Sequence, residues 1–310
     1  MRDVILCECF ARDGLQHEAD FVATATKRRL IERFADLGFP RVEATSYSNP
    51  KVVPQFADAS ALLQSLARRE GVHYKATCAN VRAVERALAD LDLGFGVNEI
   101  SLLVSASESH SQKNLRQSRA DQWANVQKMA AAAQRRFRLI GTISVAFGCP
   151  FEGAVDPAIV VVDAIRFRDL GVEHVALGDT TGVATPASIK QMVGRLCRDA
   201  PGIELIAHLH DTRGTGLVNA LAAYEAGVRY FDCSFGGVGG HPAQVKYGGG
   251  YTGNVCTEDL INLFESVGIR TGIDLDGLIA TSRLCEATLG RELFGRVTRT
   301  GLNPLLSQPA

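Results

Sequence analysis

Two histidines that lie two positions apart in an apolar run are the residues best suited to chemistry in this chain. They are His208 and His210, and Ile206 and Ala207 precede them. Such a run predicts a β-strand, in which side chains at positions i and i+2 point to the same face. Both imidazoles could therefore reach one ion. A metal site explains this pair better than two unrelated core histidines would.

Polar residues also end two other apolar runs. Arg12 and Asp13 end the first run, directly before a glycine. Asp13 could give a metal a carboxylate while Arg12 contacts a substrate oxygen; the alternative is a solvated surface pair. Asp179 and Thr180 end the sixth run, where the alternative is a turn that caps the next helix. Both interpretations stay open at each position.

A glycine-rich segment, residues 236–253, follows the eighth run and contains eight glycines. We expect it to form a loop over the site. Its stretch from Gly248 to Gly253 matches the pattern GxGxxG formally. It does not close a strand in an early strand-helix-strand unit, and it lacks the Lys-Ser/Thr of a phosphate-binding loop. A nucleotide-binding loop is therefore not indicated.

Eight apolar runs alternate with segments of helical periodicity, about 32 residues apart, which is the length of one β-loop-α-loop unit. This pattern favours a closed (β/α)8 TIM barrel over an open doubly wound sheet. Barrel enzymes carry their sites on loops after the strands, so the polar run ends should meet at one mouth. We expect strands to begin near Val4, Arg41, Val72, Asn98, Arg138, Glu173, Ile203 and Val228. We expect helices over 26–37, 81–91, 121–136, 157–170, 186–199 and 216–226.

The composition narrows the possible partners and organisation. The net charge is −1 and the basic residues are scattered, which argues against nucleic acid and anionic membrane surfaces. No apolar stretch approaches the roughly 20 residues of a membrane span. Eight cysteines without a CxxC pair fit a reduced, cytoplasmic protein better than a disulfide framework. We expect a catalytic barrel over residues 1–273 and a C-terminal helical extension over 274–310 that packs on it.

Six ordered motifs resemble the signatures of 3-hydroxy-3-methylglutaryl-CoA lyases, within the metal-dependent barrel lyases and synthases. The resemblance runs from about residue 3 to about residue 275. It implies cleavage of a 3-hydroxyacyl-CoA to acetyl-CoA and an oxo acid by a homodimer. The motifs are Arg12-Asp-Gly-Leu-Gln16, Glu43-Ala-Thr-Ser46, Gly148-Cys-Pro-Phe-Glu-Gly153, Leu177-Gly-Asp-Thr180, His208-Leu-His-Asp-Thr212 and Gly253-Asn-Val-Cys-Thr-Glu-Asp259.

The resemblance also implies roles for individual residues. Arg12 matches the arginine that steadies the enolate oxygen, and His208 or Asp13 would accept the hydroxyl proton. Two imidazoles with oxygen donors suit Mg²⁺ or Mn²⁺. The matching metal ligands are Asp13, His208, His210 and Asn254. The substrate-binding positions are Arg12, Gln16, Glu43, Asp179 and Thr180.

The glycine-rich segment departs from the lyase pattern at one position. The lyases have Gly-Gly-Cys-Pro, whose cysteine is thought to protonate the enolate, whereas this chain has His241 in place of the cysteine. His241 is either the replacement general acid or an ordinary loop residue. Ala19 also stands where the lyases often have lysine, so the CoA contacts are expected to differ. Residues that could contact the acid or a CoA phosphate instead are Lys246, Tyr247 and Tyr251.

Other functions remain open beside cleavage of a 3-hydroxy-3-methylglutaryl-CoA-like substrate. The substrate could be a related thioester such as citramalyl-CoA. The reaction could instead be a Claisen condensation of acetyl-CoA with a 2-oxo acid, although the chain lacks the Gly-Glu-Arg-x-Gly-Asn pattern of those synthases. A third alternative is a barrel that binds metal without turnover.

Overall fold

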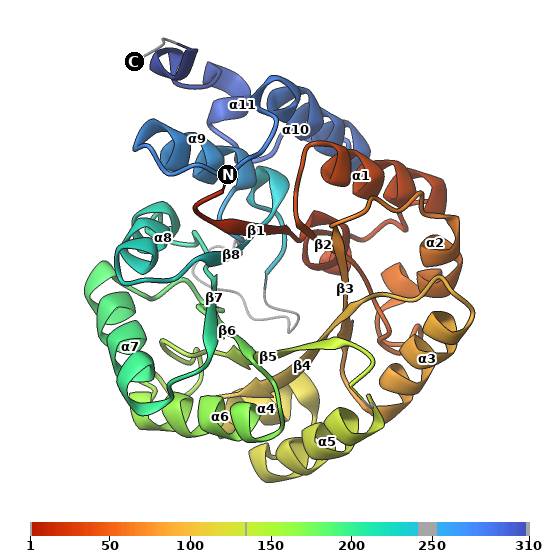
Figure 1. The fold of residues 1–310 in the computed structure, drawn as a ribbon, viewed down its shortest axis with the longest axis vertical. Coiled ribbons are helices and arrows are strands. Elements are labelled where there is room, and N and C mark those ends of the chain that lie inside the picture. The colour runs from red at the N-terminus through yellow and green to blue at the C-terminus, as the bar shows by residue number, and fades with distance from the viewer. Residues whose placement is uncertain (1, 134, 241–252, 308–310) are drawn as a thin grey trace.

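The computed structural model describes residues 2–133, 135–240 and 253–307. Eight parallel strands pair in chain order and close into a barrel inside a ring of helices (Figure 1). The predicted (β/α)8 barrel is confirmed, and each strand begins within two residues of its predicted start. The strands are β1 (Ile5–Glu8), β2 (Arg41–Ser46), β3 (His73–Cys78), β4 (Glu99–Ser105), β5 (Arg138–Ser144), β6 (His174–Gly178), β7 (Glu204–His208) and β8 (Tyr230–Cys233).

The helices that follow the strands cover the outside of the barrel, and the six predicted from periodicity are all present. Helix α9 and the two short helices α2 and α4 were not predicted. The α-helices are α1 (Thr24–Asp36), α2 (Ala59–Ser65), α3 (Val81–Asp92), α4 (Glu108–Leu115), α5 (Arg119–Ala132), α6 (Pro157–Asp169), α7 (Pro186–Asp199), α8 (Gly216–Glu225), α9 (Thr257–Ser266), α10 (Leu275–Leu289) and α11 (Val297–Thr300). Single turns are η1 (Phe10–Gly14), η2 (Leu15–His17), η3 (Pro54–Phe56), η4 (Phe235–Gly237) and η5 (Pro304–Ser307).

Local capping explains why α7 begins where the sequence predicts. The Thr185 hydroxyl accepts a hydrogen bond from the Ser188 backbone N–H at 3.2 Å, and the Ser188 hydroxyl accepts one from the Thr185 N–H at 2.9 Å. This reciprocal pair satisfies two N–H groups that the helix itself cannot. Pro186 then occupies the first helical position, where its missing N–H costs nothing.

The hydrophobic core lies mainly between the sheet and the helices, whereas the barrel interior is largely polar. Inside the barrel, Ile140, Ala176 and Ile206 form only a small apolar cluster. Beside it, the buried Glu99 carboxylate pairs with Arg41 at 3.0 Å and with Arg138 at 2.8 Å. Buried ion pairs add little net stability compared with apolar packing, so this interior is organised around charge rather than tight apolar filling.

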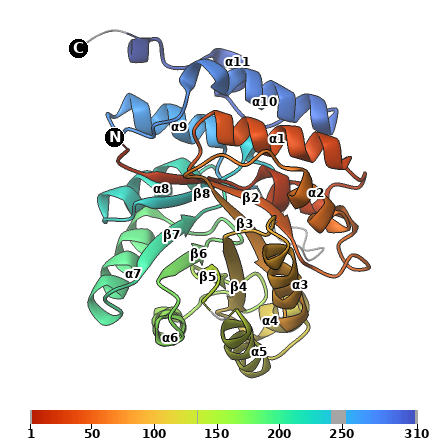
Figure 2. The same ribbon diagram turned by 45° about the vertical axis from the view of Figure 1, so that its right-hand side comes forward.

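The C-terminal segment packs on the barrel beside α1 and α9 (Figure 2). The Glu258 carboxylate in α9 accepts hydrogen bonds from Ser282 at 2.6 Å and from Thr298 at 2.8 Å. It also accepts one from the Gly236 N–H at 3.0 Å, and the Gly236 carbonyl accepts one from the Phe294 N–H at 3.1 Å. The extension therefore holds the start of the glycine-rich segment. None of the helices in the described ranges is long and apolar enough to cross a membrane.

Glu8 is a buried carboxyl group on the outer side of β1. It accepts hydrogen bonds from the Phe10 N–H at 2.9 Å, the Phe235 N–H at 3.1 Å and the Thr257 hydroxyl at 2.6 Å. Burial disfavours its charged form and raises its pKa to about 8, despite these donors. Glu8 thus ties β1 to the turn that leads to the glycine-rich segment.

This raised pKa makes the folding stability depend on pH. The folded protein binds the Glu8 proton more tightly than the unfolded chain does, so the free energy of unfolding should fall as pH rises from 4.5 to about 8. Glu8→Gln removes this titration. We expect the wild type to lose about 2–4 kcal/mol relative to the variant across that window. Urea unfolding at both ends of the window measures the difference. Glu70→Gln, at an exposed site, should keep the wild-type slope, and an equal slope in Glu8→Gln would contradict the assignment.

Candidate active site

A cavity of about 640 Å³ opens at the C-terminal ends of the strands. As predicted, polar residues that end separate apolar runs meet there, with the exception of Asp179. The predicted site residues that line it are Arg12, Asp13, Gln16, Thr180, His208 and His210. The predicted residues Glu43, Asp179 and Asn254 do not line it but lie buried in or behind its wall.

The turn η1 directs Arg12 and Asp13 toward the cavity. After β1, the backbone N–H groups of Arg12, Asp13 and Gly14 all donate to the Cys9 carbonyl, at 3.1, 2.8 and 3.2 Å. Gly14 is required because a Cβ there would lie 2.8 Å from a Val238 methyl group. The alternative of a solvated Arg-Asp surface pair is therefore wrong, since Asp13 is buried.

His208 and His210 converge as the strand spacing predicts. Their Nε2 atoms lie 3.3 Å apart, and ligand atoms of both rings and of Asp13 all lie within 4.8 Å of one another. The Nδ1 atom of His208 lies 3.2 Å from the Asp232 carboxylate. That carboxylate holds the proton on Nδ1, so the Nε2 lone pair of His208 faces the cavity.

Asn254 adds an oxygen donor to this group. Its Nδ2 donates to Asp13 Oδ2 at 2.6 Å and to the Val238 carbonyl at 3.0 Å. Its Oδ1 is buried and has no hydrogen-bond partner among the described residues. Gly239 leaves room for this arrangement, because a Cβ there would lie 2.5 Å from Asn254 Nδ2. An unpartnered amide oxygen beside a carboxylate and two imidazoles fits a divalent cation.

Arg12 is held by two carboxylates. Its Nε lies 2.7 Å from Glu43 Oε1, and its Nη1 lies 2.8 Å from Asp13 Oδ1 and 3.3 Å from Gln16 Oε1. Burial alone would raise the pKa of Asp13, but Arg12 and the two histidines lower it to about 2. The guanidinium stays charged and its orientation is set before any substrate binds.

Asp179 supports a turn rather than facing the cavity. Its carboxylate accepts hydrogen bonds from the Val183 N–H at 2.9 Å and the Ala184 N–H at 3.2 Å, while burial raises its pKa to about 6. This agrees with the turn interpretation. The neighbouring Thr180 does line the cavity, and its hydroxyl accepts from the Val145 N–H at 2.9 Å.

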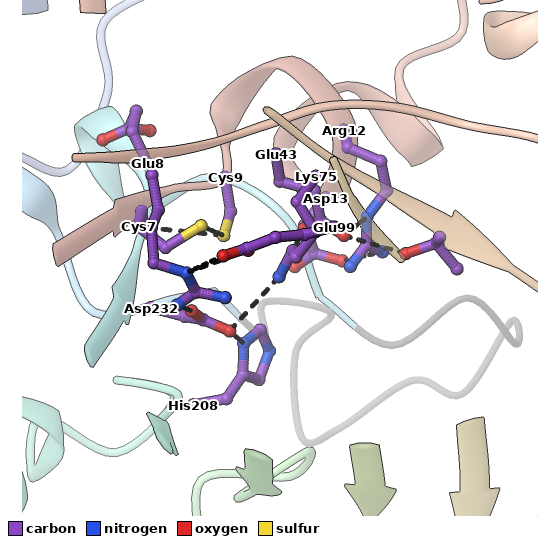
Figure 3. A network of polar contacts seen from close by, with 12 residues as sticks. Cys7, Glu8, Cys9, Arg12, Asp13, Glu43, Lys75, Glu99, His208 and Asp232 are labelled. Atoms are coloured by element: carbon purple, nitrogen blue, oxygen red, sulfur yellow. Dashed lines mark hydrogen bonds and ion pairs between the residues drawn. The ribbon is translucent and has the colours of Figure 1, made fainter. Parts of the chain in front are cut away.

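Two charged residues of the site, Lys75 and Asp232, were not predicted (Figure 3). Both are buried and line the cavity, Lys75 from β3 and Asp232 from β8. The sequence signal was a charged residue in a short run of otherwise mostly apolar or aromatic neighbours, His73-Tyr-Lys and Tyr230-Phe-Asp. An inward-facing charge in a barrel strand needs a partner, which only the fold reveals.

His17 is a further cavity residue that sequence reasoning missed. Its Nε2 lies 3.1 Å from Gln16 Nε2, and its ring contacts the backbone of Gly240 at the cavity edge. His241, like Lys246, Tyr247 and Tyr251, lies outside the described residues. The role of His241 as a general acid therefore stays a prediction.

Comparisons with known proteins agree with this geometry. A profile of the HMGL-like family matches residues 3–285. The chain is 35% identical to (R)-citramalyl-CoA lyase of Chloroflexus aurantiacus, over 97% of this chain and 96% of that protein. It is 37% identical to mitochondrial hydroxymethylglutaryl-CoA lyase of Mus musculus, over 96% of this chain and 89% of that protein.

Solved structures give the same result. An HMG-CoA lyase of A. baumannii in complex with coenzyme A and 3-methylmalate superposes with a TM-score of 0.90 and 36% identity, covering 99% of this chain and 98% of that chain. Hydroxymethylglutaryl-CoA lyase of Pseudomonas aeruginosa gives a TM-score of 0.89 and 34% identity, covering 96% and 97%. The family match spans nearly the whole barrel, including every described residue of the site. The chain therefore belongs to the HMGL-like family and is a lyase.

Proposed function

We propose that this protein is a divalent-metal-dependent lyase that cleaves a 3-hydroxyacyl-CoA with a carboxylate on its acyl group to acetyl-CoA and an oxo acid. The observation that carries this proposal is the position of Arg12. Its guanidinium lies beside Asp13, in the same cavity wall as His208 and His210. A fixed cation next to a metal donor set suits a reaction that develops an enolate beside a bound hydroxyl group.

The proposed metal ligands are Asp13, His208, His210 and Asn254, with Mg²⁺ or Mn²⁺ as the metal. When bound, such an ion lowers the pKa of the substrate hydroxyl and orients it. Two observations support the fit of these residues to a divalent cation. The Nε2 atoms of His208 and His210 converge, and the Oδ1 of Asn254 has no hydrogen-bond partner among the described residues.

The chain's own residues would then move protons and hold the enolate. The 3-hydroxyl proton leaves to a base, the C2–C3 bond breaks, and its electron pair forms the thioester enolate, whose oxygen faces Arg12. The candidate bases are His208 and Asp13. Protonation of the enolate carbon completes acetyl-CoA, and His241 remains our candidate acid for that step.

The hydroxyl groups that line the cavity favour a substrate whose acyl group ends in a carboxylate. These hydroxyl groups come from neighbouring strands and from the second residue after β6, and they can donate hydrogen bonds to carboxylate oxygens. The residues are Ser101, Thr142, Ser144 and Thr180. The A. baumannii relative was solved with 3-methylmalate, a hydroxy dicarboxylic acid, together with coenzyme A. We infer that the substrate is 3-hydroxy-3-methylglutaryl-CoA or citramalyl-CoA.

We also propose a cytoplasmic homodimer with a barrel over residues 1–273 and an extension over 274–310. The eight cysteines are all free thiols, which supports a reduced compartment. Hydrogen bonds from Ser282 and Thr298 to Glu258 support an extension that is packed on the barrel.

A thioester panel tests the proposed function. Purified protein with Mg²⁺ or Mn²⁺ is incubated with 3-hydroxy-3-methylglutaryl-CoA, both citramalyl-CoA epimers and a 3-hydroxyacyl-CoA without a carboxylate. We expect acetyl-CoA from at least one carboxylated thioester, none from the last, and none after chelation, as followed by mass spectrometry. Condensation of acetyl-CoA with a 2-oxo acid and no cleavage would replace the lyase by a synthase. Tight metal binding with neither reaction would indicate a non-catalytic barrel.

A further inference from the structure

Lys75 is a buried lysine in the barrel interior whose charge is shared between two carboxylates (Figure 3). Its side chain is 4% exposed. Its Nζ lies 3.6 Å from Glu43 Oε2 and 3.6 Å from Asp232 Oδ2. Neither separation is short enough for a good hydrogen bond, so both contacts act mainly through charge.

The two carboxylates hold different parts of the site. Glu43 receives the Arg12 guanidinium at 2.7 Å and the Thr77 hydroxyl at 2.8 Å. Asp232 receives His208 Nδ1 at 3.2 Å. Lys75 is therefore the one described residue that pairs with both the carboxylate behind Arg12 and the carboxylate behind His208.

The balance of charge around Arg12 depends on Lys75. Arg12 is one cation with two carboxylates, Asp13 and Glu43, within 3 Å. The proposed metal ion would offset the charge of Asp13, whereas Glu43 by itself would cancel the charge of Arg12 and weaken its attraction for an enolate. Among the described residues, only Lys75 and Arg12 form ion pairs with Glu43, and its Oε2 has no hydrogen bond. Lys75 thus offsets the negative charge of Glu43. The buried site has a low dielectric constant, so this charge pair interacts more strongly there than it would in water.

We propose that Lys75 is a positioning residue that neutralises Glu43, so that Arg12 keeps its attraction for the developing enolate oxygen. Because it acts through Arg12, Lys75 affects the transition state more than the bound substrate. This inference rests on the enolate-forming reaction proposed above. Burial alone would lower the pKa of Lys75, but Asp232 and Glu43 raise it above its ordinary value, in keeping with a permanent charge.

Lys75→Met, of similar length and without charge, tests this role beside Lys75→Arg, which keeps the charge. We expect Lys75→Met to lower kcat by about 10- to 100-fold, the range typical of residues that support a site from behind, with KM changed less than about threefold. Lys75→Arg should recover most of the lost kcat. Lys190→Met, at an exposed position on α7, is the control and should match the wild type.

Calorimetric titration of the metal-free variants with Mn²⁺ separates this role from a structural one. Removing a positive charge near the donors should leave Mn²⁺ binding by Lys75→Met at least as tight as in the wild type. Unchanged kcat in Lys75→Met would overturn the inference. So would a joint loss of kcat, Mn²⁺ affinity and melting temperature that Lys75→Arg does not restore. If the wild type cleaves no thioester, the proposed function fails instead, and weaker Mn²⁺ binding by Lys75→Met would still overturn the inference about Lys75.

Discussion

Replacing His210 with alanine is expected to remove metal binding and turnover together. The Nε2 atoms of His210 and His208 lie 3.3 Å apart, and Asp13 completes a group within 4.8 Å. Loss of one of four ligands leaves a site with too few donors for a hard cation that already binds protein weakly. We expect the Mn²⁺ affinity to fall by at least about 100-fold, a larger loss than outer-shell changes cause. Calorimetry on the metal-free protein measures this directly.

Two further variants provide comparisons for the Mn²⁺ affinity of His210→Ala. Asp232→Asn keeps all four proposed ligands but weakens the group that fixes the His208 tautomer, so its Mn²⁺ affinity should fall by about 10- to 100-fold. His73→Gln changes a histidine at the other end of the barrel, next to Glu99, and should bind Mn²⁺ like the wild type. Tight binding by His210→Ala would remove His210 from the ligand set.

Arg12→Met is expected to lower kcat by about 10²- to 10³-fold, the typical cost of losing one donor to a developing oxyanion. KM should change far less, because the enolate charge appears only in the transition state. Steady-state kinetics on the best thioester of the panel measures both constants. Mn²⁺ binding should persist, because Asn254 still holds Asp13 in place at 2.6 Å.

Arg12→Lys is the matched control for charge. An ammonium group cannot bridge Glu43 and Asp13 in the planar fork that Arg12 uses, so we expect it to restore only a small part of kcat. Full activity in Arg12→Lys would show that charge alone suffices. Full activity in Arg12→Met would exclude Arg12 from enolate stabilisation.

The strands and six of the longer helices could be predicted because their signals are local. Helix α7 has its capping residues and its apolar periodicity within one short stretch of sequence. Helix α4 has few apolar residues and no clear apolar face, and α2 has only seven residues, so periodicity did not reveal either. Their positions depend on neighbours that pack against them, which a local pattern cannot contain.

The site was predictable to the extent that its residues are paired in sequence or end a strand. His208 and His210 face one side because of strand geometry, and Arg12 and Asp13 follow β1 at the same mouth. Asp179 shows the limit of this reasoning, because a strand-end position does not tell whether a side chain faces the cavity or folds back onto its own turn. In this protein it accepts backbone hydrogen bonds behind Thr180.

The sequence by itself determined the barrel, the pair of histidines on one strand face and, through ordered motifs, the family. Only the tertiary structure decided which charges neutralise one another inside the barrel. Lys75 comes from β3, Glu43 from β2 and Asp232 from β8, and these strands are brought around a common interior only when the barrel closes. The physical reason is that a buried charge is stabilised by whatever opposite charge lies within a few ångströms, and sequence separation does not enter that distance.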